Sequence, residues 1–166
     1  MSYATAQQFA DKYGLSVTTL LLASLEPGAS TDPAVLEKLL GGDAPSGEAE
    51  EALARGLTRL VLALDDQSDM ADTYLTQAVA LPLEQATIDA NPIAAYVCDL
   101  ARYALATKPG VRHKQIEDDK ADALAWFQRV GRGAAGLLGL PTGESTTQVA
   151  VNARAKTYTD DVWSKY

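Results

Sequence analysis

The sequence contains only one cysteine and one histidine, and each shortage excludes a class of protein. A lone Cys98 cannot form an internal disulfide, which fits a reducing compartment. His113 lies in the basic run Arg112-His113-Lys114 and has no Cys or carboxylate partners at the spacing of a metal site. We therefore expect no structural zinc site, no other bound metal and no cofactor.

Long apolar runs and catalytic motifs are also lacking. No stretch approaches 18 consecutive apolar residues, so no transmembrane helix is expected, and the N-terminus has no basic start and apolar core that would direct export. The G-x-S-x-G, P-loop and dinucleotide-binding motifs are absent. Gly131, Gly133 and Gly136 follow a helical pattern and not a strand, so they indicate the end of a helix. We expect no enzymatic activity, since an enzyme would require an unrecognised carboxylate pair.

Basic residues are scarce relative to acidic ones. The chain has 14 Lys and Arg against 22 Asp and Glu, a net charge of −8 and a pI near 4.5. Proteins that bind nucleic-acid phosphates tightly need clustered Lys and Arg, so the net charge argues against a nucleic-acid-binding protein. An acidic surface would suit DNA that passes without sticking, although simple solubility explains the same composition.

Two groups of acidic residues stand out within helical patterns: Asp65, Asp66, Asp69 and Asp72, and Glu117, Asp118, Asp119 and Asp122. The first group resembles a metal cluster in residue type. It has no glycine turn and no histidine, which excludes an ordinary Ca²⁺ loop and favours a solvated acidic face.

The dominant positive feature is helical periodicity, which predicts a mainly α protein: a small helical bundle with a long central helix. Thr5 and Asp32 are suited to cap helices that run to Tyr13 and Leu40, and Gly14 and Gly41-Gly42 to end them. A short apolar stretch covers 16–25. Longer helices are expected over 48–79, 92–108 and 115–131, and Leu81-Pro82-Leu83 turns the chain between the first two.

The apolar positions of these helices define a predicted core. They fall on one stripe in each helix: Leu53, Leu57, Leu60 with Val61, Leu64, Ala71 and Leu75; Ile93, Tyr96, Val97, Leu100 and Ala104; Ile116, Ala123 with Leu124, and Phe127. Cys98 is expected to be a small buried side chain. Asp99 and Arg102 can meet on one helix face or bind chain ends nearby, in a structural role.

The C-terminal segment differs in pattern. Val149, Val151 and Ala153 alternate with polar residues, which predicts a short strand that must pair with a neighbouring subunit or another protein. The last nine residues hold three of the chain's eleven aromatics. We expect a helical domain over 1–138 and an extended tail over 139–166. The tail either anchors a partner protein through its aromatics or folds back onto its own domain.

Residues spread along the chain carry a resemblance to a known family. They are Tyr3-Ala4-Thr5, Phe9, Tyr13-Gly14, Tyr74-Leu75, Leu81-Pro82-Leu83, the helix Cys98-Asp99-Leu100-Ala101-Arg102-Tyr103, the segment 120–133, Leu138-Gly139-Leu140-Pro141 and the ending Tyr158-Thr159-Asp160-Asp161-Val162-Trp163-Ser164-Lys165-Tyr166. In this order they resemble the neck proteins of Mu-like phages and prophages, which are related to head–tail adaptors. Asp160, Trp163 and Lys165 depart from the family's usual Arg, Leu and Gly.

The resemblance implies a helical adaptor that forms a ring, commonly of twelve copies, beneath the portal protein of a tailed phage. The ring would bridge the capsid and a downstream neck or tail protein, with genomic DNA passing through its centre, and one acidic group would line that channel. The partner-binding residues would be Tyr158, Thr159, Asp160, Asp161, Val162, Trp163, Lys165 and Tyr166, bound to the portal or to a neighbouring subunit. The protein would be made in the host cytoplasm and carried in the virion. The alternatives are a stopper or tail terminator, which are usually β-rich, and a soluble regulatory protein.

Overall fold

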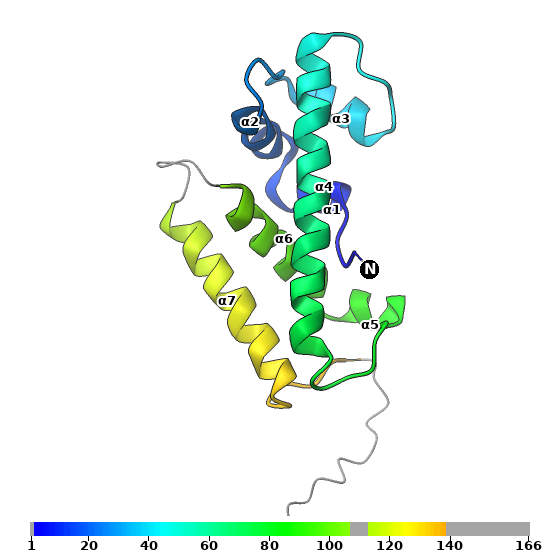
Figure 1. Ribbon diagram of the computed structural model, residues 1–166, viewed down its shortest axis with the longest axis vertical. Coiled ribbons are helices and arrows are strands. Elements are labelled where there is room, and N and C mark those ends of the chain that lie inside the picture. Colours follow the sequence, from blue (N-terminus) through cyan, green and yellow to red (C-terminus); the bar gives the residue numbers. More distant parts are fainter. Residues whose placement is uncertain (1, 107–112, 139–166) are drawn as a thin grey trace, which may run out of the picture.

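A computed structural model describes residues 2–106 and 113–138, which form seven helices and no strand (Figure 1). The helices in chain order are α1 (Ala6–Tyr13), α2 (Leu15–Leu25), α3 (Pro33–Leu40), α4 (Glu48–Leu75), α5 (Gln85–Ala90), α6 (Ile93–Leu105) and α7 (Lys114–Gly131). The prediction of a mainly α bundle with a long central helix is confirmed.

The 28 residues of α4 form the axis of the bundle and span about 42 Å. Helices α1, α2, α3, α6 and α7 all contact α4, and α6 and α7 also pack against each other along their lengths. In Figure 1, α2 and α3 surround one end of α4, whereas α6 and α7 run beside its other half. The core lies between α4 and these helices, and its largest fully buried side chains include Phe9, Leu22, Leu53, Leu60 and Phe127.

The helix starts follow the predicted capping chemistry. The Thr5 hydroxyl accepts a hydrogen bond from the Gln8 N–H, and the Gln8 side chain accepts one from the Thr5 N–H, which satisfies two backbone donors at the start of α1. Asp32 accepts from the Ala34 N–H at the start of α3, where Pro33 occupies the first helical position.

A glycine permits the close crossing of α2 over α4. A Cβ atom on Gly56 would lie 3.0 Å from the Leu22 carbonyl oxygen and 3.2 Å from the Leu22 Cβ atom. Both residues are buried, so any side chain at 56 would push the two helices apart. Glu26, just after α2, adds a polar link, since it lies 2.8 Å from Arg59 and 3.5 Å from Arg55 on α4.

The structure corrects two features of the predicted long helix. It ends at Leu75 and not at Val79, because the N–H groups of Gln77 and Ala78 donate to carbonyls three residues back and tighten the last turn. Val61 is 43% exposed, because it lies about 100° around the helix from the buried Leu60.

Three further helix assignments differ from the sequence prediction. The apolar stretch from 16 to 25 is a complete helix, α2, and the six-residue α5 was not expected. Helix α6 ends at Leu105, where Ala106 caps it and donates to the Arg102 carbonyl, and not at Lys108. Ala104 and Tyr96 in α6 are only half-buried, whereas Ile93, Val97, Cys98 and Leu100 are in the core as predicted.

The last described residue, Leu138, is fixed to the body of the protein by one side chain. The Asn91 amide donates to the Leu138 carbonyl over 2.9 Å and accepts from the Leu138 N–H over 3.0 Å. The predicted strand and the tail at 139–166 lie outside the described residues.

Candidate functional site

An apolar groove of about 340 Å³ opens between α1, α2, the C-terminal part of α6 and the start of α7. Its lining combines apolar and aromatic side chains with two basic ones: Phe9, Tyr13, Val17, Leu20, Leu21, Ser24, Arg102, His113 and Ile116. Two of these apolar side chains are strongly exposed, Val17 at 46% and Leu20 at 58%. Among the residues that the structure describes, none of those lining the groove is a carboxylate.

Helix α2 creates the exposed part of this groove because it is apolar on every side. Within Leu15–Leu25 only Thr18, Thr19 and Leu22 are buried, and the two threonine hydroxyls donate to carbonyls one turn back in or just before the helix. Leu15, Leu21 and Leu25 pack against the core while partly buried, and Val17 and Leu20 face the groove and solvent. The exposed apolar surface could be expected from the sequence. An 11-residue helix with no charged residue and with apolar residues on every side cannot bury all of its faces against one neighbour.

A buried carboxylate lies behind the groove and joins α1 to α6. Asp99 is 7% exposed and accepts from the Lys12 ammonium over 2.6 Å and from the Tyr13 hydroxyl over 2.5 Å. The Lys12 ammonium also donates to the Ala95 carbonyl over 2.7 Å. With an ammonium and a hydroxyl donating to one oxygen, the carboxylate is held in place and fixes Tyr13 against the groove.

The hydroxyl of Tyr13 is correspondingly hard to ionise. Burial raises the pKa of Tyr13 well above its usual range, and the hydrogen bond to Asp99 and the charge of that carboxylate raise it further. Burial likewise raises the pKa of the neighbouring Cys98 thiol to about 11. The wall of the groove therefore carries a neutral phenol at physiological pH, and Cys98 is a buried thiol as predicted.

Arg102 has different partners from those predicted. Its guanidinium stacks over the Tyr13 ring at 4.5 Å from the centroid and lies 4.0 Å from an Asp119 oxygen on α7. Asp99 faces Lys12 and Tyr13 on α1. The two members of the predicted pair on α6 are thus directed to two different neighbouring helices.

The C-terminal end of α7 is closely packed with aromatic side chains, unlike its N-terminal end beside the groove. Phe127 is fully buried, and its ring centroid lies 5.1 Å from that of Trp126, 6.3 Å from Tyr96 and 6.5 Å from Tyr74. The Trp126 and Tyr96 rings lie 5.3 Å apart. This aromatic cluster joins α4, α6 and α7, and it explains why Ala123 and Phe127 point inward as predicted.

The four acidic residues of α4 have different environments. Asp65, Asp66 and Asp69 are exposed, whereas Asp72 is half-buried and accepts a hydrogen bond from the Tyr3 hydroxyl. Burial and this hydrogen bond raise the pKa of Tyr3. Asp72 therefore helps to secure the N-terminal residues on α4, and the other three carboxylates face away from the core.

The four acidic residues of α7 also have different environments. Glu117, Asp118 and Asp122 are exposed. Asp119 is half-buried, faces Arg102 and accepts from the Gln115 amide over 2.7 Å. Each acidic group thus has one half-buried residue, Asp72 or Asp119, that contacts another element, and three exposed residues.

The partner-binding candidates at 158–166 and the strand residues Val149, Val151 and Ala153 lie outside the described residues. Within 2–106 and 113–138, no set of three or more His, Cys, Asp or Glu side chains is placed to hold a metal ion. In the same part of the chain, no helix has the length and apolarity needed to cross a membrane.

Together these observations define a small, mainly helical protein whose described residues form an apolar groove with a basic edge. The chain belongs to the bacteriophage Mu Gp36 family, whose model matches residues 3–157. The match covers nearly the whole chain and points to a role in the structure or morphogenesis of a Mu-like phage. Comparison with curated proteins and with solved structures finds no match.

Proposed function

We propose that this protein is a head–tail adaptor, a neck component that forms a ring beneath the portal, bridges capsid and tail, and lets DNA pass. The observation that carries the proposal is the family match over residues 3–157 on a body whose described residues are all helical or irregular. Stoppers and tail terminators are usually built on β-rich frameworks, so the helical body favours the adaptor among neck proteins.

In this proposal the residues at 158–166 attach the ring to the portal or to a neighbouring copy. Aromatic anchors carry most of the binding energy at protein interfaces, and this segment contains Tyr158, Trp163 and Tyr166. The described helices bury a continuous core among themselves, which supports a body that folds independently of its C-terminal segment.

The acidic surface would serve the passage of DNA. An acidic wall repels phosphate, so a duplex can slide along it without binding. The exposed members of the two groups, on α4 and on α7, are the candidates for this wall, and the proposal requires one of these faces to line the channel.

The test is to delete the gene from a phage genome and examine the particles by electron microscopy. We expect DNA-filled heads and separate tails, because an adaptor is needed to join them, and the protein supplied in trans should restore joined particles. A matched complementation with a chain truncated after Leu138 should fail to attach to portal while its helical body remains folded. Complete, infectious particles that lack the protein would refute the adaptor role and favour a regulatory one.

A further inference from the structure

The described residues expose only five large apolar side chains strongly, and four of them form two compact patches. Val17 and Leu20 belong to the groove. Val61 and Leu62, 43% and 57% exposed, lie on the middle of α4. The groove patch is concave, and the α4 patch is the convex surface of a helix, so the two have complementary shapes.

The α4 patch faces directly away from the core. Leu62 lies about 200° around the helix from the fully buried Leu60. Asp65 and Asp66, one turn further along α4, are exposed on the same side. An outward leucine is therefore followed by two carboxylates, on a stretch of α4 that no other described helix covers.

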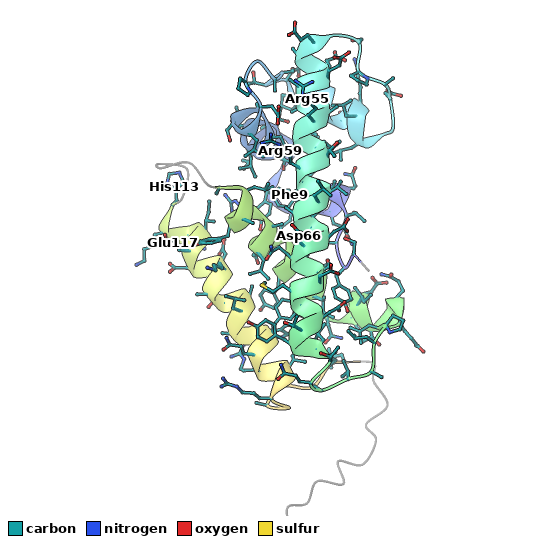
Figure 2. All side chains as sticks on the ribbon, in the orientation of Figure 1. Phe9, Arg55, Arg59, Asp66, His113 and Glu117 are labelled. Atoms are coloured by element: carbon teal, nitrogen blue, oxygen red, sulfur yellow. The ribbon has the colours of Figure 1, made fainter. Side chains whose placement is uncertain are left out.

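The charges of the two patches are opposite. Among the described residues, the groove is lined by Arg102 and His113 and by no carboxylate. Leu62 is flanked by Asp65 and Asp66 on one side and by Arg59 on the other, and the Arg59 charge is balanced by Glu26 at 2.8 Å. Figure 2 shows His113 at the end of α7 nearest the groove and Asp66 midway along α4, so the two patches lie on different parts of the surface. Complementary patches on different faces of one chain produce head-to-tail contacts, which close into a ring when the rotation between copies allows it.

We propose that the groove receives the outward face of α4, centred on Leu62, from a second copy of this chain. Leu62 would pack against Val17 and Leu20, while Asp65 and Asp66 approach Arg102 and His113. This interface rests on the proposed ring and names its subunit contact. The carboxylates of α4 would then be used between subunits, which leaves the exposed Glu117, Asp118 and Asp122 on α7 for the channel wall.

The test uses two variants of the full chain, each defective on one patch. Leu20→Glu places a carboxylate in the groove, where it repels Asp65 and Asp66, and Leu62→Glu removes the apolar centre of the α4 patch. Both side chains are exposed, so both variants should keep the cooperative unfolding of the wild type. Leu138→Glu is the matched control, because Leu138 is an equally exposed leucine outside both patches.

Sedimentation velocity up to about 1 mM protein is the measurement, a range that detects even weak association. We expect the wild type and Leu138→Glu to form species larger than dimers as concentration rises, and each patch variant alone to associate at least about tenfold more weakly. An equimolar mixture of the two patch variants should form a heterodimer and nothing larger, because one intact groove and one intact α4 face remain in each pair.

Three results would overturn the interface. The wild type could stay monomeric at the highest concentration, or Leu62→Glu could associate as the wild type does. Alternatively, Leu20→Glu and truncation after Leu138 could both abolish association while Leu62→Glu does not, which would assign the groove to the C-terminal segment. None of these results decides whether the protein lies in the phage neck, which the particle experiment tests separately.

Discussion

The two ends of α7 show opposite uses of aromatic and apolar side chains. At its C-terminal end, Phe127 and Trp126 fill the space against Tyr74 and Tyr96 on α4 and α6. At its N-terminal end, Ile116 is one wall of a groove of about 340 Å³ that α1 and α2 leave open. Since close packing is the normal state of a protein interior, the filled end is where stability is concentrated, and the open end has surface available for a partner.

Removing the centre of the filled end should have the largest effect. Phe127→Ala deletes a fully buried ring with three aromatic neighbours and should lower the free energy of unfolding by ~3–5 kcal/mol. The matched change at the open end, Ile116→Ala, should cost only ~2 kcal/mol, because its surroundings already adjoin solvent. Chemical denaturation of both variants measures the difference. Equal losses would mean that the groove end is as tightly packed as the aromatic end.

A smaller effect is expected from the close contact that ends α7. A Cβ atom on Gly131 would lie 2.8 Å from the Tyr74 carbonyl oxygen, so Gly131→Ala should destabilise the protein by ~1–3 kcal/mol. The sign is informative, since replacing glycine by alanine within a helix normally stabilises by ~1 kcal/mol. Gly136→Ala is the control, because its Cβ would meet nothing within 4 Å. Thermal melting of both variants should separate them, and a stabilised Gly131→Ala would show that α4 and α7 can move apart freely.

The smallest predicted effect concerns the groove end and pH. The pKa of Tyr13 is higher in the folded protein than the value of 10.0 for an unfolded tyrosine. The Tyr13 hydroxyl therefore contributes its full stabilisation below pH 10, and this stabilisation is progressively lost as pH rises above 10. The wild type should therefore lose stability above pH 10 more steeply than Tyr13→Phe. At neutral pH, Tyr13→Phe should cost ~1 kcal/mol for the lost hydrogen bond to Asp99. Urea titrations across the alkaline range test this, and parallel curves for the two proteins would contradict it.

Local rules predicted the helix starts and most of the core. Thr5 and Asp32 cap their helices as expected, because capping depends on residues within one turn of each other. Ile93, Val97, Ile116 and Phe127 are buried as their spacing indicated. The end of α4 escaped prediction because Leu75 and Val79 keep a helical spacing even where the backbone has tightened into a turn.

Long-range contacts could not be predicted from spacing. The pattern on α6 placed Asp99 near Arg102, but Asp99 binds Lys12 and Tyr13, which are more than eighty positions earlier in the chain. The groove likewise depends on how α1 and α2 sit against α6 and α7. Only α2 indicated the groove in the sequence. Its residues Val17 and Leu20 are apolar but are not needed to fill the core.

The two hydrogen bonds between Asn91 and Leu138 determine where the remaining chain is tethered. They hold both backbone polar groups of Leu138 and so fix the origin of the 28 residues that follow, at the end of the body near α5. An origin fixed in this way sets a maximum reach of about 90–100 Å for the last residue, at 3.3–3.6 Å per residue. A binding site for residue 166 must therefore lie within that radius of Leu138. Asn91→Ala would remove both hydrogen bonds, so the centre of that radius would no longer be fixed beside α5.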